Sequence, residues 1–194
     1  VSNPAQMPSV LNRALNTAIG QNGVAVLVIP GDVALANAPV SAVPPQAVPA
    51  LPRILPREEE ISRLVNLLNE GKAITILAGS GCAGHHDAVV ALAEALKAPV
   101  VHALRGKEHV EWDNPFDVGM TGLIGFSSGY HAMENADTLV MLGTDFPYRA
   151  FYPTKARIIQ IDRDAGALGK RATLTQGLVG DVGETISALL PHLK

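Results

Sequence analysis

From residue 57 onward, short apolar runs alternate with segments of helical periodicity, and this alternation constrains the fold more than any other feature. The apolar runs predict strands at 73–78, 100–103, 138–142, 156–161 and near 178. The helical patterns predict one helix that begins near Pro56, with an apolar stripe from Ile61 to Leu68, and further helices over 87–97, 129–136 and 182–190. Such alternation is typical of a parallel sheet covered on both faces. We therefore predict an α/β fold, a Rossmann-like three-layer parallel sheet, over 57–194.

The first 56 residues have a different organisation. Residues 8–19 have helical spacing and end at Gly20, and the apolar run 23–30 predicts a buried strand. One helix and one strand cannot bury each other, which indicates that 1–38 is the C-terminal remnant of a larger domain. Six prolines between 39 and 56 predict an extended interdomain linker.

Composition and charge exclude several classes of partner. The net charge is −3 with no basic run, so nucleic acid is not an expected ligand.

The single cysteine, Cys82, points to a reducing compartment. Apolar runs stay below the roughly 18 residues of a membrane span, and no signal-peptide pattern opens the sequence. We expect a cytoplasmic protein.

Two glycine-broken loops between 119 and 153 predict the ligand site. An apolar strand ends in Gly143-Thr144-Asp145, and open α/β sheets bind ligands beyond the carboxyl ends of their strands. The upstream loop 121–125, TGLIG, has little side-chain bulk and allows close approach of a cofactor. Two such loops in one domain predict a large, extended ligand.

Residues 79–84, GSGCAG, form a glycine fingerprint after the first strand of this unit. Its amides suit a phosphate, and a tight turn that needs glycine explains the same residues. A dinucleotide site also expects an acid after the second strand, but none occurs before Glu108. A standard NAD site is therefore disfavoured.

Charged residues after the strands supply further candidates. Arg105 could neutralise a pyrophosphate through its planar guanidinium. Lys107 and His109 could do the same, but a solvated loop explains these two residues equally well. Asp162 ends a strand, where its carboxylate could accept hydrogen bonds from both hydroxyls of a ribose. An Asx turn or a helix cap is the alternative interpretation of this residue. Asp181 has a similar position, but its capping-box spacing to Glu184 favours a helix cap.

We predict no metal site and no catalytic residue. Adjacent residues such as His85 and His86 point about 100° apart on a helix and do not share an ion. Cys82 has no histidine base assigned to it and is interpreted as a small buried thiol. Trp112 is expected to pack within its loop.

Three segments closely resemble the central domain of bacterial pyruvate oxidases, also called pyruvate:quinone dehydrogenases, which depend on thiamine diphosphate and FAD. They are 101–110 (VHALRGKEHV), 119–129 and 146–153 (FPYRAFYP), within a similarity that covers 56–194. Residues 1–38 resemble the end of the family's preceding pyrimidine-binding domain. The resemblance thus implies a remnant at 1–38, a linker at 39–56 and a central FAD-binding domain at 57–194.

The resemblance also implies an FAD site in this chain. The diphosphate and ribityl chain would lie near Gly79, Ser80, Gly81 and Arg105. The flavin and its linker would lie near Thr121, Gly122, Leu123, Ile124, Gly143, Thr144, Asp145, Phe146, Pro147 and Tyr148. The adenosine ribose would contact Asp162, and the adenine would lie near Asp181 and Val182.

Thiamine diphosphate and Mg²⁺ would bind outside this chain. Gly31-Asp32 and Gly180-Asp181 are each followed by valine, without the family's metal motif, and the activating glutamate belongs to an N-terminal region. The chain alone should therefore be inactive. The resemblance implies a tetrameric parent that oxidises pyruvate to acetate and CO₂ and passes electrons through FAD to a quinone at the inner face of the cell membrane. Alternatives are an acetolactate-synthase relative with structural FAD, a scaffold without flavin and, more distantly, an NAD-dependent enzyme.

Overall fold

The computed structural model describes residues 1–38 and 50–194, which form two compact units, Val1–Pro52 and Arg53–Lys194. Most of the predicted linker, 39–49, lies outside the described residues. Its last four residues belong to the second unit, where the backbone N–H of Ile54 donates to Asp181 Oδ2 at 2.7 Å. The second unit therefore begins slightly before the predicted boundary.

The first unit contains the 3₁₀ turn Pro4–Gln6 and the helices α1 (Met7–Gly20) and α2 (Gly31–Ala34). Helix α1 confirms the predicted helix and its end at Gly20. The predicted strand over 23–30 is wrong, because these residues form no ladder within the described part of the chain. Val24, Val26 and Val28 are 93%, 79% and 72% exposed. A strand needs a hydrogen-bonded neighbouring strand, and within the described residues no strand pairs with this run.

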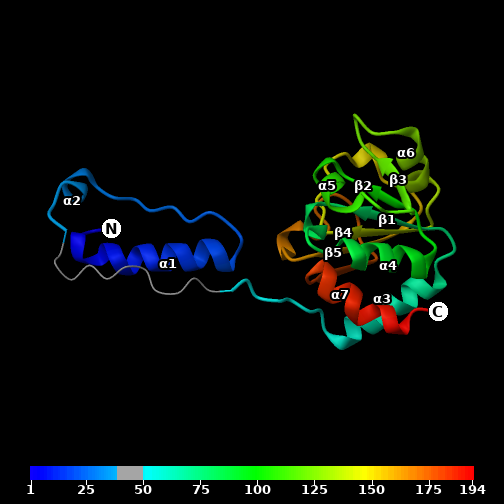
Figure 1. Cartoon of the computed structure of the whole chain (residues 1–194), viewed down its shortest axis with the longest axis horizontal. Helices are drawn as coiled ribbons and strands as arrows, with labels where there is room; N and C mark the ends of the chain where they lie inside the picture. The colour runs from blue at the N-terminus through cyan, green and yellow to red at the C-terminus, as the bar shows by residue number, and fades with distance from the viewer. Residues whose placement is uncertain (39–49) are drawn as a thin grey trace. The chain divides into compact units, whose positions relative to one another are not determined.

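The second unit is built on one six-stranded sheet in the order β3-β2-β1-β4-β5-β6 (Figure 1). Its strands are β1 (Ile74–Ala78), β2 (Val100–His102), β3 (Asp117–Met120), β4 (Thr138–Leu142), β5 (Arg157–Asp162) and β6 (Gln176–Val179). Every neighbouring pair is parallel. The predicted parallel α/β fold is confirmed.

Helices cover both faces of this sheet (Figure 1). Helices α3 (Glu58–Glu70), α4 (His86–Leu96) and α7 (Val182–Leu189) pack on one face, and α6 (Ser127–Glu134) lies on the other. Side chains alternate along the strands accordingly. Ile76 and Val140 belong to the larger core, and Leu77 and Met141 to the smaller one. Burial on both faces explains why these strands read as continuous apolar runs.

In the second unit, the sequence analysis missed one strand and one α-helix, both short. Strand β3 was read as part of a glycine-broken loop, because it carries Asp117 and a Gly119 with φ of +93°. It is an edge strand and pairs only with β2, so it needs no continuous apolar run. Helix α5 (Lys107–Val110) was read as a loop because it is a single turn.

Candidate functional site

The predicted ligand residues gather along the carboxyl edge of the sheet, because every strand is parallel. The segments 79–81 and 143–148 follow β1 and β4, the two central strands. The strand order reverses between β1 and β4, and open α/β sheets bind ligands at such a switch point. The fold thus places the predicted loops at the expected position.

The glycine fingerprint packs against the loop that follows β4. The backbone N–H of Gly79 donates to Leu142 O at 2.9 Å, and that of Gly81 donates to Gly143 O at 3.0 Å. A Cβ on Gly81 would lie 2.6 Å from Gly143 Cα. Both N–H groups are therefore occupied within the protein and do not face a phosphate. Close packing of two loops accounts for these glycines, rather than a tight turn, since neither has a positive φ.

The loop after β3 combines a buried hydroxyl with exposed apolar side chains. Thr121 is 3% exposed, and its Oγ1 has no hydrogen-bond partner. Gly122 adopts φ of +112°, a left-handed conformation that suits glycine. Leu123 and Ile124 are 73% and 68% exposed. The loop therefore leaves both a polar atom and an apolar surface without protein partners.

The segment after β4 divides between the core and the surface. Thr144 is buried, and its carbonyl accepts a hydrogen bond from Gln160 Nε2 at 3.2 Å. The Phe146 ring belongs to the smaller core and packs edge-on against Tyr148, with centroids 5.4 Å apart. Pro147 and Tyr148 are exposed. Tyr148 and Pro147 can thus contact a ligand, whereas Phe146 mainly supports them.

Asp145 is tied to the segment that follows β5. Its carboxylate accepts from Arg171 Nε and Lys170 Nζ, both at 2.8 Å. Partial burial opposes ionisation of Asp145, but these hydrogen bonds outweigh that effect and hold its pKa below the ordinary value. The group acts as an anchor for the 170–171 segment.

Asp162 is the last residue of β5, whereas Asp181 lies two residues beyond the end of β6, and their surroundings differ. Asp162 Oδ1 accepts from the N–H of Asp164 at 2.9 Å, the Asx-turn geometry, and burial raises the pKa of its carboxyl group. Asp181 accepts from Ile54 N–H and from Arg163 Nε at 2.8 Å. It stands at the N-cap of α7 but makes no side-chain capping bond, so the predicted capping box is wrong. The competing donors occupy both of its oxygens.

Three predicted ligand residues remain: Ser80, Val182 and Arg105. Ser80 lies half-buried in a 3₁₀ turn, and Val182 is 3% exposed within the larger core. Arg105 is exposed and forms no ion pair within the described residues. Lys107 instead lies in the helical turn α5, not in the predicted loop, and pairs with Glu111. Arg105 is therefore the basic group of this loop that is free to meet an anion.

The histidine pair and the cysteine have structural surroundings. His86 stacks on Trp112 with ring centroids 3.9 Å apart, and His85 packs against Gly183 of α7. Cys82 is fully buried, and burial raises the pKa of its thiol to about 12. A protonated, inaccessible thiol is a poor nucleophile. His102, Glu111 and Asp117, which the sequence analysis did not single out, lie close together because β2 and β3 are neighbours.

The family model for the central domain of thiamine pyrophosphate enzymes matches residues 61–189. The chain belongs to this family. An uncharacterized 42.6 kDa protein from the isoamylase 3′ region of Pseudomonas amyloderamosa is 59% identical over all of this chain and 49% of that protein. The acetolactate synthase large subunit of Corynebacterium glutamicum is 30% identical over all of this chain and 32% of its own length. This thiamine pyrophosphate enzyme domain thus spans half or less of these relatives.

A solved structure agrees with the family assignment. The crystal structure of a candidate thiamin diphosphate-dependent enzyme from Mycobacterium smegmatis superposes with a TM-score of 0.80 at 25% identity, covering all of this chain and 38% of that one.

Within residues 1–38 and 50–194, none of the helices has the length and apolar character needed to cross a membrane.

Proposed function

We propose that this chain is the FAD-binding central domain of a thiamine-diphosphate-dependent enzyme that oxidatively decarboxylates pyruvate to acetate and CO₂. The observation that carries the proposal is the buried Thr121 hydroxyl, which lacks a hydrogen-bond partner at the carboxyl edge of the sheet. Buried polar groups almost always have a partner, so a ligand with polar atoms is the natural complement. The exposed Leu123 beside it suits an apolar ring system.

Three side chains would provide the polar contacts. The guanidinium of Arg105 matches a diphosphate, and the Thr121 hydroxyl can donate to or accept from the cofactor. Asp162 can accept from ribose hydroxyls through the oxygen that the Asp164 amide leaves free. FAD, once bound, supplies the electron-accepting chemistry. The protein orients the cofactor and excludes water from it.

Other candidates would act by holding the loops in place. Gly79, Gly81 and Gly143 keep two loops in contact, and Asp145 anchors the segment after β5. Asp181 fixes the chain at Ile54. Ser80, Gly122, Ile124, Thr144, Pro147 and Tyr148 complete the proposed lining, whereas the Val182 side chain is buried in the larger core.

The rest of the parent enzyme belongs to the proposal as well. Thiamine diphosphate and Mg²⁺ would be held by neighbouring domains and subunits of a homotetramer. Electrons would leave FAD for a quinone, with the cytoplasmic parent peripheral at the inner face of the membrane.

A second candidate is an enzyme of the acetolactate synthase type, in which FAD is structural. The 30% identity to an acetolactate synthase large subunit favours it. The full-length parent separates the two: reduction of a soluble quinone analogue with pyruvate supports the oxidase, and acetolactate formation without quinone reduction supports the synthase.

FAD binding by this chain is tested by titrating it with FAD and following flavin absorbance and fluorescence after gel filtration. We expect Arg105→Ala and Asp162→Asn to weaken retention, while Lys97→Gln, at the far end of α4, leaves it unchanged. Equal retention of FAD by the unmodified chain and by all three variants would refute the proposed site.

A further inference from the structure

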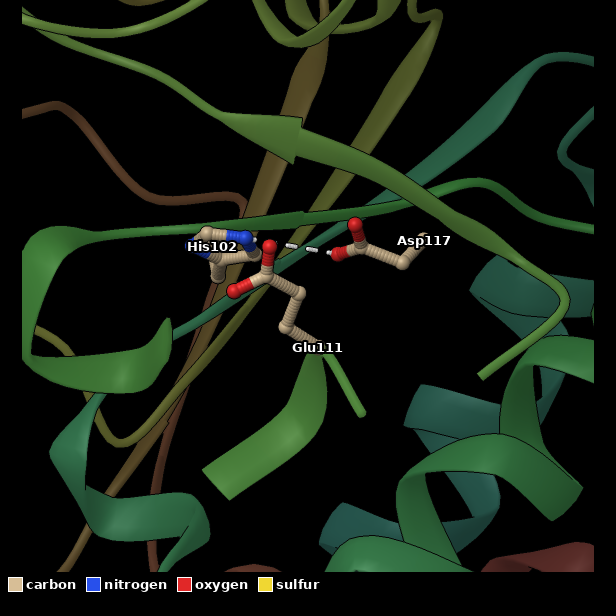
Figure 2. A group of neighbouring side chains, drawn as sticks. All are labelled: His102, Glu111 and Asp117. Carbon is tan, nitrogen blue, oxygen red and sulfur yellow. Dashed lines mark ion pairs between the residues drawn. The ribbon is translucent and has the colours of Figure 1, made fainter. Parts of the chain in front are cut away.

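His102, Glu111 and Asp117 form a cluster of ligand-type atoms outside the proposed FAD contacts (Figure 2). His102 is the last residue of β2, Asp117 is the first of β3, and Glu111 directly follows α5. One nitrogen and two carboxylate oxygens from these residues lie within 4.8 Å of one another. Figure 2 shows the three side chains converging from three segments.

The histidine is buried without hydrogen bonds. His102 is 1% exposed, and neither ring nitrogen has a hydrogen-bond partner. Its Nε2 lies 3.4 Å from Asp117 Oδ1, which is also buried and lacks a hydrogen bond. Leaving buried polar atoms unsatisfied is costly, so the approach of His102 Nε2 to Asp117 Oδ1 indicates a missing binding partner at this position.

A backbone hydrogen bond holds the Asp117 carboxylate in position. The N–H of Gly119 donates to Asp117 Oδ2 at 3.1 Å, which leaves Oδ1 directed toward His102 Nε2. An imidazole nitrogen and a carboxylate oxygen thus lie side by side in a buried position.

We propose that His102, Asp117 and Glu111 bind a divalent transition-metal ion, with zinc the best match and water at the fourth position. One imidazole nitrogen with two carboxylates suits zinc, whereas magnesium and calcium prefer oxygen ligands alone. The ion would join the edge strand β3 to β2 and to the end of α5.

A positive charge already sits near this position. Lys107 Nζ forms an ion pair with Glu111 Oε2, four residues along the chain. The Lys107 side chain is 50% exposed, so it can swing into solvent when a metal ion takes its place. The ammonium is thus a competitor for Glu111, and its removal should strengthen metal binding.

The experiment is calorimetric titration of the full chain with Zn²⁺ after chelator treatment, with Co²⁺ absorption as a second readout. We expect one saturable site, with Glu111→Gln and Asp117→Asn each weakening it at least tenfold. Lys107→Gln should bind Zn²⁺ more tightly, and Mg²⁺ should bind far more weakly. Because Glu111 and Lys107 are partly exposed, their variants test the site without disturbing the core.

His131→Asn is the matched control, since His131 and Glu134 form an exposed pair with a separation of 3.5 Å. It should leave the affinity unchanged. The proposal would be overturned if the chain had no saturable Zn²⁺ site. It would also be overturned if Glu111→Gln bound Zn²⁺ as tightly as the unmodified chain, or if the control lost binding.

Discussion

The backbone of Gly81 lies against that of Gly143, with the N–H of Gly81 donating to the carbonyl oxygen of Gly143 at 3.0 Å. A Cβ built on Gly143 would lie 2.4 Å from Gly81 Cα, and Gly143 adopts φ of +54°. The loops after the two central strands therefore meet through backbone atoms alone. This contact holds the loop after β1 against the loop after β4.

Gly81→Ala should destabilise the second unit by about 1–3 kcal/mol, because its Cβ overpacks the Gly143 backbone. Chemical denaturation followed by circular dichroism measures the change. Gly84→Asn is the control, since nothing lies within 4 Å of its Cβ position and asparagine tolerates its φ of +75°. A stability for Gly81→Ala equal to that of the unmodified chain would contradict the packing argument.

Thr121→Val should raise the stability of the FAD-free chain by up to about 1 kcal/mol, because it removes a buried hydroxyl that has no partner. The same change should weaken FAD binding by up to about tenfold if the hydroxyl contacts the cofactor. Thr185→Val removes another unpartnered buried hydroxyl and should affect stability alone. Thermal denaturation and FAD titration together separate the two effects.

Asp145→Asn should flatten the acid limb of the stability curve. The pKa of Asp145 is lowered on folding, so its contribution to the free energy of unfolding is complete above about pH 3.8 and is lost as pH falls through the folded value. The partly exposed pairs with Lys170 and Arg171 contribute about 1 kcal/mol. Urea denaturation between pH 2.5 and 7 measures this, with exposed Asp113→Asn as the control. A parallel shift of the curve at all pH values would argue against the linkage.

Cys82 should resist thiol reagents in the folded protein at pH 8, since it is fully buried and its thiol pKa is raised to about 12. Ellman's reagent should react with no thiol per native chain and with one per chain in guanidinium chloride. Rapid reaction under native conditions would show that the turn after β1 opens readily.

The fluorescence of Trp112, the single tryptophan, should report the titration of His86. The Asp87 carboxylate raises the pKa of His86 above 6.5, against partial burial, with further help from the Trp112 carbonyl. Fluorescence should rise with a midpoint above pH 6.5 as the quenching imidazolium loses its proton. The stabilisation by this group is complete below about pH 6.5 and is lost as pH rises through the folded pKa.

Asp87→Asn should lower that midpoint, and His86→Gln should abolish the transition. An unchanged fluorescence profile in His86→Gln would assign it to another group.

Local sequence patterns were sufficient to predict most of the strands and helices of the second unit. Apolar runs marked five of its six strands, because strands buried on both faces have no polar side. They failed at β3, where an edge position permits Asp117 and a left-handed Gly119. They also failed at 23–30, where an apolar run has no neighbour to pair with in the described chain.

The sequence by itself determined the α/β class and the loops that would surround a ligand, because both follow from periodicity and glycine placement over short segments. Only the tertiary structure decided which polar groups are already used. The amide of Gly79 donates to the end of β4, and that of Gly81 donates to the loop after β4. Asp145 and Asp181 are already paired with basic side chains and a backbone amide, whereas Thr121 and His102 are left without hydrogen-bond partners. Such pairing depends on residues up to 127 positions apart, which approach one another only when the sheet is complete.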